Sequence, residues 1–243
     1  MSKMLEVTGL TKRFGGLTAV NNVSINVEKG EIVGLIGANG AGKTTLFNMV
    51  AGEFPPTEGK IVFNGKEIQG NPGYKMCHMG IGRTYQIVKP FSSLTVLDNV
   101  VVGALLKDSN VKRAREKARK VIDLVGLGYR ADVVGADLNL PELKRLELAR
   151  ALATDPELLL LDEVMAGLNP ADSDKMIELV KEINKTGITI IIIEHVMKAI
   201  MRLSDRIYVL NQGCLIAQGK PEEVSNNPEV IKSYFGEKRY AKN

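Results

Sequence analysis

The sequence predicts an α/β fold with a buried, largely parallel core sheet. Three short apolar runs lead into polar groups: residues 32–36 into a glycine-rich turn, residues 158–161 into Asp162 and Glu163, and residues 190–193, after one intervening residue, into His195. Continuous apolar runs of this kind are typical of parallel strands that are buried on both faces. Because ligands of such sheets bind at the carboxyl ends of the strands, we expect these polar groups to meet there.

The first two thirds of the chain add a second layer and a helical region. Alternating apolar residues predict strands over 4–10 and 20–27, and Asn64-Gly65 predicts the turn of a hairpin over 61–68, so an antiparallel β layer should accompany the core sheet. Helical patterns dominate about 94–152, which we expect to be a helical subdomain inserted into a single domain spanning 1–243. Its apolar face is predicted to contain Val111, Ala114, Ala118, Val121 and Val125.

Strand and helix alternate again in the last third. A helix over 170–185, ended by Gly187, is predicted between strands over 157–161 and 188–193, and residues 211–213 should form a turn. A short last helix is expected to begin at Asn227-Pro228 and to stop at Gly236.

The composition limits the class of protein. With 243 residues, 44% of them hydrophobic, the chain can bury the core of one large domain. The net charge of +4 is mild and gives no reason to expect a nucleic acid partner. Cys77 and Cys214, the two cysteines, lack metal-site spacing, which favours a reduced, cytosolic setting. The apolar runs are far shorter than the roughly 20 residues of a membrane span, so we expect any membrane contact to be made through a partner.

The turn at residues 37–44 carries the pattern G-x-x-x-x-G-K-S/T of a phosphate-binding loop, between an apolar strand and a helix. This predicts a P-loop nucleotide hydrolase. Glycines let backbone N–H groups surround a phosphate, Lys43 supplies a mobile charge, and the Thr44 hydroxyl is placed to coordinate Mg²⁺. The alternative is a glycine-rich turn that only joins the strand to the helix and binds no phosphate. The residues expected to contact ATP here are Gly37, Asn39, Gly40, Ala41, Gly42, Lys43, Thr44 and Thr45.

Two acids and a histidine complete the predicted catalytic site. We expect Asp162 to hold Mg²⁺ and Glu163 to orient or deprotonate the water that attacks the terminal phosphate. Acids in this position can instead cap a following helix or turn. His195 is expected to contact the terminal phosphate, although a single histidine is more often structural.

With these residues in order, the chain resembles the ATP-binding cassette family over nearly its whole length. The resemblance implies a nucleotide-binding domain with a mixed core sheet, an antiparallel β layer and an inserted helical subdomain. It also implies that Gln86 contacts Mg²⁺ and relays the nucleotide state to a membrane partner near residues 89–91. Phe14 matches the aromatic residue that stacks on adenine, and a core or hairpin phenylalanine is the alternative.

Two further segments resemble family motifs with substitutions. Residues 166–169 resemble the D-loop, with Asn169 in place of aspartate, and Asn169 can equally be the N-cap before Pro170. Residues 138–142, Leu-Asn-Leu-Pro-Glu, stand where the family has the signature Leu-Ser-Gly-Gly-Gln. Cassettes of the family pair head to tail across ATP, which implies that Asn139 contacts the nucleotide of a partner. The alternative is that Pro141 opens an ordinary packing helix, and competence for hydrolysis is left open.

Within the family, residues 83–86, 94–100, 166–170 and 227–237 are most similar to ATPases of branched-chain amino acid importers. This likeness implies import of branched-chain or other hydrophobic amino acids, driven by ATP with Mg²⁺. It further implies transmembrane permease subunits, a second ATPase subunit in a heterodimer or a homodimer, and a periplasmic binding protein that acts indirectly. The expected location is the cytoplasmic face of the inner membrane. The alternatives are an ATPase for lipopolysaccharide extraction, a soluble cassette acting on ribosomes or DNA, and a small-molecule phosphotransferase.

Overall fold

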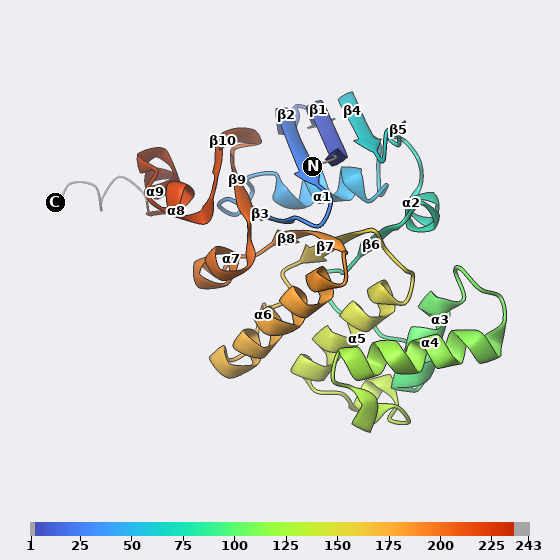
Figure 1. The fold of residues 1–243 in the computed structure, drawn as a ribbon. Coiled ribbons are helices and arrows are strands. Elements are labelled where there is room, and N and C mark those ends of the chain that lie inside the picture. The colour runs from blue at the N-terminus through green and yellow to red at the C-terminus, as the bar shows by residue number, and fades with distance from the viewer. Residues whose placement is uncertain (1–2, 236–243) are drawn as a thin grey trace.

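The computed structural model describes residues 3–235, which fold into two sheets and a set of flanking helices (Figure 1). The strands are β1 (Lys3–Phe14), β2 (Leu17–Glu28), β3 (Ile32–Ile36), β4 (Glu58–Phe63), β5 (Lys66–Glu67), β6 (Ile81–Arg83), β7 (Leu158–Asp162), β8 (Thr189–Ile193), β9 (Arg206–Asn211) and β10 (Cys214–Gly219). The helices are α1 (Lys43–Val50), α2 (Gly73–Met79), α3 (Val96–Ala104), α4 (Val111–Leu124), α5 (Leu140–Leu152), α6 (Pro170–Lys185), α7 (Met197–Leu203), α8 (Pro221–Ser225) and α9 (Pro228–Phe235).

The core sheet is mixed, as predicted. Its six strands have the order β10-β9-β3-β8-β7-β6, and all neighbours are parallel except β10, which runs antiparallel to β9. The second sheet is the predicted antiparallel layer, with the order β2-β1-β4-β5. Its predicted Asn64-Gly65 turn is confirmed, with φ of 47° and 75° at the two residues. The parallel pairing brings the carboxyl ends of β3, β7 and β8 to one edge.

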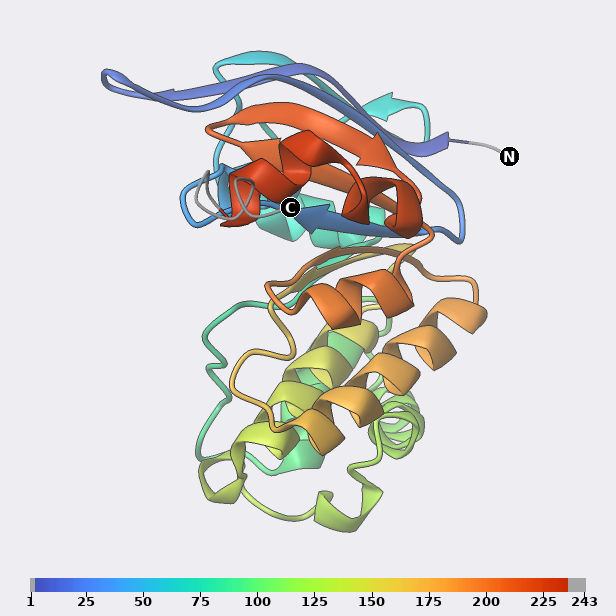
Figure 2. The same cartoon turned by 90° about the vertical axis from the view of Figure 1, so that its left-hand side faces the viewer.

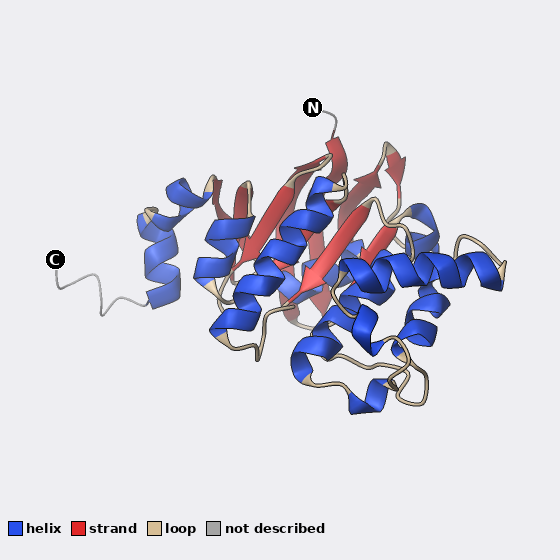
Figure 3. Ribbon diagram, turned by 60° about the horizontal axis from the view of Figure 1, so that its bottom comes forward, coloured by secondary structure: helices blue, strands red, loops and turns tan. Residues whose placement is uncertain are grey.

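Alternate residues along the core strands enter two different apolar clusters. Leu158 and Leu160 pack with α1 and the antiparallel layer, whereas Leu159 and Leu161 pack with helices α3 to α7. Figures 2 and 3 show the result, with the antiparallel layer on one face of the core sheet and helices on the other. Strands that are apolar on both faces can therefore carry polar groups at their ends without interrupting either cluster.

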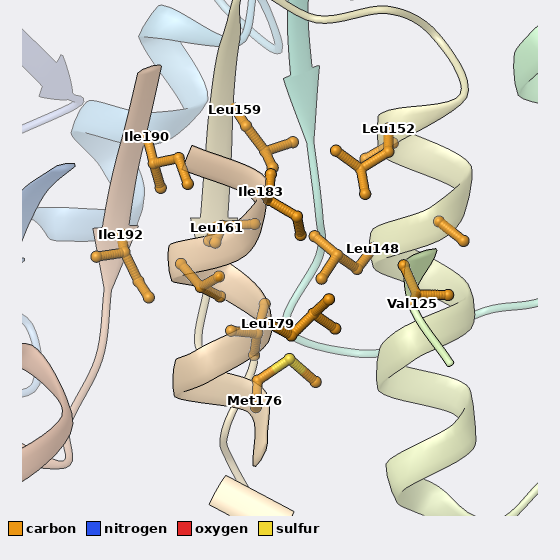
Figure 4. Packing of buried hydrophobic residues seen from close by; sticks show 14 of the residues in the cluster. Val125, Leu148, Leu152, Leu159, Leu161, Met176, Leu179, Ile183, Ile190 and Ile192 are labelled. Carbon is orange, nitrogen blue, oxygen red and sulfur yellow. The ribbon is translucent and has the colours of Figure 1, made fainter. Parts of the chain in front are cut away.

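Helices α3, α4 and α5 form the helical part of the molecule within residues 96–152. In Figure 4, Leu148 and Leu152 of α5 face Leu159 of β7 and the apolar side of α6. The helical part thus shares one apolar cluster with the core sheet. The bounds of about 94–152 for an inserted subdomain stay a prediction.

Most of the predicted elements agree with the structure, and a few do not. Helix α6 has the predicted bounds, and the turn at residues 211–213 joins β9 to β10. The placement of Val111 on the apolar face is wrong, because Val111 begins α4 with 58% of its surface exposed, while Ile122 is buried instead. The expected stop at Gly236 lies outside the described residues. Over residues 3–235, none of the helices has the length and apolar character needed to cross a membrane.

The packing of α5 on the sheet predicts a large effect of one truncation. Leu148 is fully buried between α5 and the core sheet, so Leu148→Ala should lower the free energy of unfolding by about 2–5 kcal/mol, through lost apolar burial and the cavity left behind. Urea unfolding followed by circular dichroism measures this change. The control is Leu124→Ala on α4, where the side chain is 40% exposed and the expected loss is below about 1 kcal/mol. Equal losses in the two variants would contradict the packing.

Candidate active site

The phosphate-binding loop connects β3 to α1 and contains glycines that no other residue could replace without displacement of the backbone. A Cβ atom on Gly37 would lie 2.2 Å from the carbonyl oxygen of Leu210, and one on Gly42 would lie 2.5 Å from that of Ala19. Gly42 is also the N-cap of α1, with a left-handed φ of 100°. A Cβ atom on Gly40 would meet nothing within 4 Å, so this glycine borders open space. The loop can thus present backbone N–H groups and the positive end of α1 to an anion.

Lys43 spans this loop from the first turn of α1. Its ammonium group donates to the carbonyl oxygens of Gly37 at 2.7 Å and Ala38 at 3.0 Å, and the residue is 6% exposed. Burial lowers the pKa of the Lys43 ammonium, while the carboxylates of Glu163 and Asp162 act in the opposite direction. The charge of Lys43 is therefore held inside the loop, close to both predicted catalytic acids.

Glu163 lies at the centre of the predicted hydrolytic groups. Its carboxylate contacts the His195 imidazole, with 2.5 Å between Oε1 and Nε2, and its other oxygen accepts a hydrogen bond from the Gln86 amide at 2.8 Å. These three residues follow β7, β8 and β6, so the parallel sheet brings them together from segments that are far apart in the sequence. The structure thereby joins three residues that the sequence placed in one site.

Asp162, Thr44 and Gln86 line the same cavity of about 680 Å³. Asp162 is 2% exposed, and burial raises the pKa of its carboxyl group, while the neighbouring Arg83 guanidinium acts against this rise at 3.5 Å. A hydroxyl, an amide oxygen and one carboxylate are hard oxygen ligands, and Mg²⁺ is commonly bound by one or two carboxylates together with substrate phosphates. The three side chains therefore fit Mg²⁺ that is bound with a nucleotide.

Phe14 lines a second cavity, of about 310 Å³, together with Leu17, Ala19 and residues 40–45 of the phosphate-binding loop. Its ring is 46% exposed and makes an edge-to-face contact with Phe54, with 5.4 Å between ring centroids. The alternative of a core phenylalanine is wrong, because Phe14 is half exposed, whereas the alternative of a hairpin phenylalanine holds, because Phe14 pairs with Leu17 at the end of the β1–β2 hairpin. Its predicted contact with adenine stays a prediction.

Asn139 and Asn169 are both helix N-caps. The Asn139 side chain accepts a hydrogen bond from the backbone N–H of Glu142 at 3.0 Å, and the Glu142 carboxylate accepts one from the N–H of Asn139, which forms a capping box at the start of α5. The Asn169 side chain caps α6 by accepting a hydrogen bond from the backbone N–H of Asp172 at 2.9 Å. The capping alternative therefore holds for Asn169, and Pro141 lies in the first turn of α5, as the alternative for residues 138–142 had it. Asn139 lines neither of the two cavities above, and its contact with a partner's ATP stays a prediction.

Four charged residues near the site were not predicted as site residues: Arg83, Lys144, Glu147 and Glu194. They share deep burial, with Arg83 side-chain exposure of 9% and the other three residues between 2% and 7% exposed. Glu194 accepts a hydrogen bond from the N–H of Met165 at 2.8 Å, and the Glu147 carboxylate accepts one from the N–H of Tyr85 at 2.6 Å. A charged residue directly after an apolar run, as at Glu194, is the one local signal that could have found any of them.

The sequence was compared with models of known families and with known proteins, and it matches one family. The model of the family described as ABC transporter matches residues 20–166, and that of the branched-chain amino acid ATP-binding cassette transporter matches residues 214–239. The high-affinity branched-chain amino acid transport ATP-binding protein LivG of Salmonella typhimurium is 44% identical over 250 residues, covering 96% of this chain and 98% of the relative.

Solved structures show the same likeness. The ADP conformation of MJ1267, an ATP-binding cassette of an ABC transporter, superposes with a TM-score of 0.89 at 31% identity, covering 98% of this chain and 100% of that one. A dimeric post-hydrolysis state of the ATP-binding cassette MJ0796, bound to ADP and phosphate, superposes with a TM-score of 0.81 at 25% identity, covering 90% of this chain and 99% of that one.

Glu194 gives the stability of the fold a pH dependence. Burial raises the pKa of its carboxyl group to about 7, from 4.5 in the unfolded chain. Between these values the folded protein binds a proton that the unfolded chain has lost, so the free energy of unfolding falls as the pH rises through this window, and the loss is complete above about 7. Its magnitude is on the order of 3 kcal/mol.

Glu194→Gln should remove this contribution. Urea unfolding of the nucleotide-free protein at about pH 5 and about pH 8 should show a smaller difference for Glu194→Gln than for the wild type. The control is Glu182→Gln, which changes an exposed acid on α6 and should keep the wild-type difference. An unchanged pH dependence in Glu194→Gln would disprove the assignment.

Proposed function

The chain belongs to the ABC transporter family, and we propose that it is the ATP-hydrolysing subunit of an importer for branched-chain or other hydrophobic amino acids. The observation that carries the catalytic part is the Glu163 carboxylate, held by Gln86 and His195 beside the cavity lined by Thr44 and Asp162. The substrate class is supported by the likeness to LivG over nearly the full length of both chains and by the family match at residues 214–239.

The proposed reaction is attack of water on the terminal phosphate of ATP. The backbone of the phosphate-binding loop and the Lys43 ammonium bind the phosphates, and Phe14 stacks on the adenine. Thr44, Gln86 and Asp162 hold Mg²⁺, which when bound neutralises charge on the phosphate oxygens. The Glu163 carboxylate orients the water and accepts its proton.

His195 and Gln86 keep Glu163 in place before the reaction. Both side chains bond to the same carboxylate, one at each oxygen. We propose that the His195 imidazole turns to the terminal phosphate once ATP is bound, which frees Oε1 to accept the proton of water. Loss of the phosphate would then restore the contact between the imidazole and the carboxylate, so that His195 distinguishes the states before and after hydrolysis.

The surface next to this site fits a membrane partner. The cavity that contains Asp162 is also lined by Arg83, Tyr85 and Ile87, and the last two residues are 50% and 70% exposed. Arg83, Tyr85 and Arg150 continue into a second hollow with Val102, which is 46% exposed. We propose that a permease subunit docks on this surface, with apolar side chains against Tyr85 and Ile87 and an acidic group near the arginines.

The proposed assembly contains a second cassette. The solved dimer of MJ0796 supports pairing of two ATPase subunits, and we favour a heterodimer, with a homodimer as the alternative. In this assembly Asn139 would contact the ATP of the paired subunit, two permease subunits would span the inner membrane, and the chain would lie on its cytoplasmic face. A periplasmic binding protein would deliver the solute. The relatives described above give no support to lipopolysaccharide extraction, to a soluble cassette or to a phosphotransferase.

The first test removes the proton acceptor. Glu163→Gln should lower kcat for ATP hydrolysis by about 100-fold or more, because an amide cannot accept the proton of the attacking water, while the affinity for ATP stays within about threefold of wild type. Phosphate release and binding of a fluorescent ATP analogue measure the two quantities. Lys43→Ala is the contrasting variant, with reduced ATP affinity as its expected defect. Brisk hydrolysis by Glu163→Gln would contradict the role of Glu163.

The second test addresses the transported solute. The intact complex, isolated with its permease subunits and reconstituted in liposomes with its binding protein, should hydrolyse ATP faster when leucine, isoleucine or valine is supplied. The control is the same complex with an acidic amino acid, which should leave the rate at its basal value. Stimulation by lipopolysaccharide instead of leucine, isoleucine or valine would overturn the substrate assignment and leave the ATPase assignment intact.

A further inference from the structure

Lys144 is a buried cation that connects three separate parts of the molecule. It belongs to α5 and is 3% exposed. Its ammonium group donates to the carbonyl oxygen of Gln86 at 3.2 Å and to that of Glu163 at 3.1 Å. The side chain therefore bridges the helical part of the molecule, the segment after β6 and the segment after β7.

Lys144 is one member of a stripe on α5 that holds the backbone of residues 85–89. Glu147, three positions further on, accepts a hydrogen bond from the N–H of Tyr85 at 2.6 Å, and Arg150 donates to the carbonyl oxygen of Lys89 at 2.9 Å. Residues spaced by three lie on the same side of a helix. The three bonds join the backbone around Gln86 to α5, so displacement of the helix would displace Gln86 as well.

The contact with Glu163 matters because the backbone of this residue has an unusual conformation. Its φ is 51°, in the left-handed region that costs free energy for any residue with a Cβ atom. Three bonds maintain it: the Glu163 N–H donates to the carbonyl oxygen of Ile193, and its own carbonyl oxygen accepts from the N–H of Ala166 and from Lys144. Of these three, the bond from Lys144 is the one that comes from the helical part.

Electrostatics add a second effect of the same side chain. Burial raises the pKa of the carboxyl groups of Glu147, Asp162 and Glu194, and the positive charge of Lys144 acts against this rise at each of them. Lys144 is therefore the cation on α5 whose charge reaches acids on three different segments around the site.

We propose that Lys144 is a positioning residue for ATP hydrolysis, which fixes the backbone of Glu163 and of Gln86 relative to α5. The inference rests on the proposed role of Glu163 as proton acceptor. When α5 is in the orientation seen here, Lys144 holds the left-handed turn that points the Glu163 carboxylate towards Gln86 and His195. Movement of α5 would release the carbonyl groups of Gln86 and Glu163 together. It would thereby change the backbone conformation of Glu163, the catalytic acid.

The test compares three variants of the full-length chain in steady-state hydrolysis of ATP with Mg²⁺. Lys144→Met removes the donors and should lower kcat by about tenfold or more, with the KM for ATP within about threefold of wild type. Lys144→Arg keeps a charged donor and should restore at least about a third of the wild-type kcat. Arg145→Met, which removes the next cation on α5 from a cleft shared with Glu178, should keep the wild-type kcat.

Hydrogen exchange provides a readout that does not depend on turnover. The backbone amides of residues 163–168 should exchange faster in Lys144→Met than in the wild type, with no change for Arg145→Met. If Lys144→Met does not fold, Lys144→Ala, which also lacks a donor, takes its place in both measurements, with the same direction expected. Wild-type kcat in the donor-free variant, or a defect confined to KM, would overturn the proposal.

A double-mutant comparison and Glu163→Gln separate the possible failures. Because Lys144 is proposed to act partly through Gln86, the fall in kcat for Lys144→Met should be smaller in a Gln86→Ala background than in the wild type, and equal falls would count against the proposal. If Glu163→Gln is inactive while Lys144→Met is fully active, the role of Lys144 alone is disproved. If Glu163→Gln hydrolyses ATP normally, the proposed function itself fails.

Discussion

The active site depends on one constraint, which is that the core strands are apolar on both faces. Leu158 to Leu161 send alternate side chains into two separate clusters, so the first position where a carboxylate can stand without breaking either cluster is the end of the strand. Parallel pairing of β6, β7 and β8 then sets the carboxyl ends of these three strands side by side. The meeting of Gln86, Glu163 and His195 follows from this arrangement of the sheet.

Much of this arrangement could be predicted from the sequence because its signals are local. The phosphate-binding loop is a continuous segment, and Asp162, Glu163 and His195 each directly follow or closely follow an apolar run. The antiparallel layer followed from period-two alternation and from one Asn-Gly turn. The face of α4 was predicted less well, since Val111 at the first helical position is mostly exposed, whereas Ile122 in the last turn is buried.

The residues that the sequence did not disclose contact backbone or carboxylate groups of distant segments. Lys144, Glu147 and Arg83 look like ordinary charges of a helix or a strand end, and nothing in their spacing shows that they are buried. Their partners are a carbonyl oxygen, an N–H group and a carboxylate that are 58, 62 and 79 positions away along the chain. Such contacts depend on how α5 packs against β6 and β7, and that packing is decided by the apolar cluster, not by the charged residues themselves.

The helix N-caps explain how a segment that departs from the family pattern still starts a helix in the right place. In residues 138–142 the capping box between Asn139 and Glu142 satisfies two backbone N–H groups that would otherwise lack partners, and Pro141 needs no donor at this position in the first turn. The capping box fixes where α5 begins, and the apolar cluster fixes the rotation of α5 about its axis that directs Lys144, Glu147 and Arg150 towards residues 85–89. The capping residues at the start of α5 and the catalytic carboxylate of Glu163 are therefore connected through a single helix, even though Asn139 itself lines neither cavity of the site.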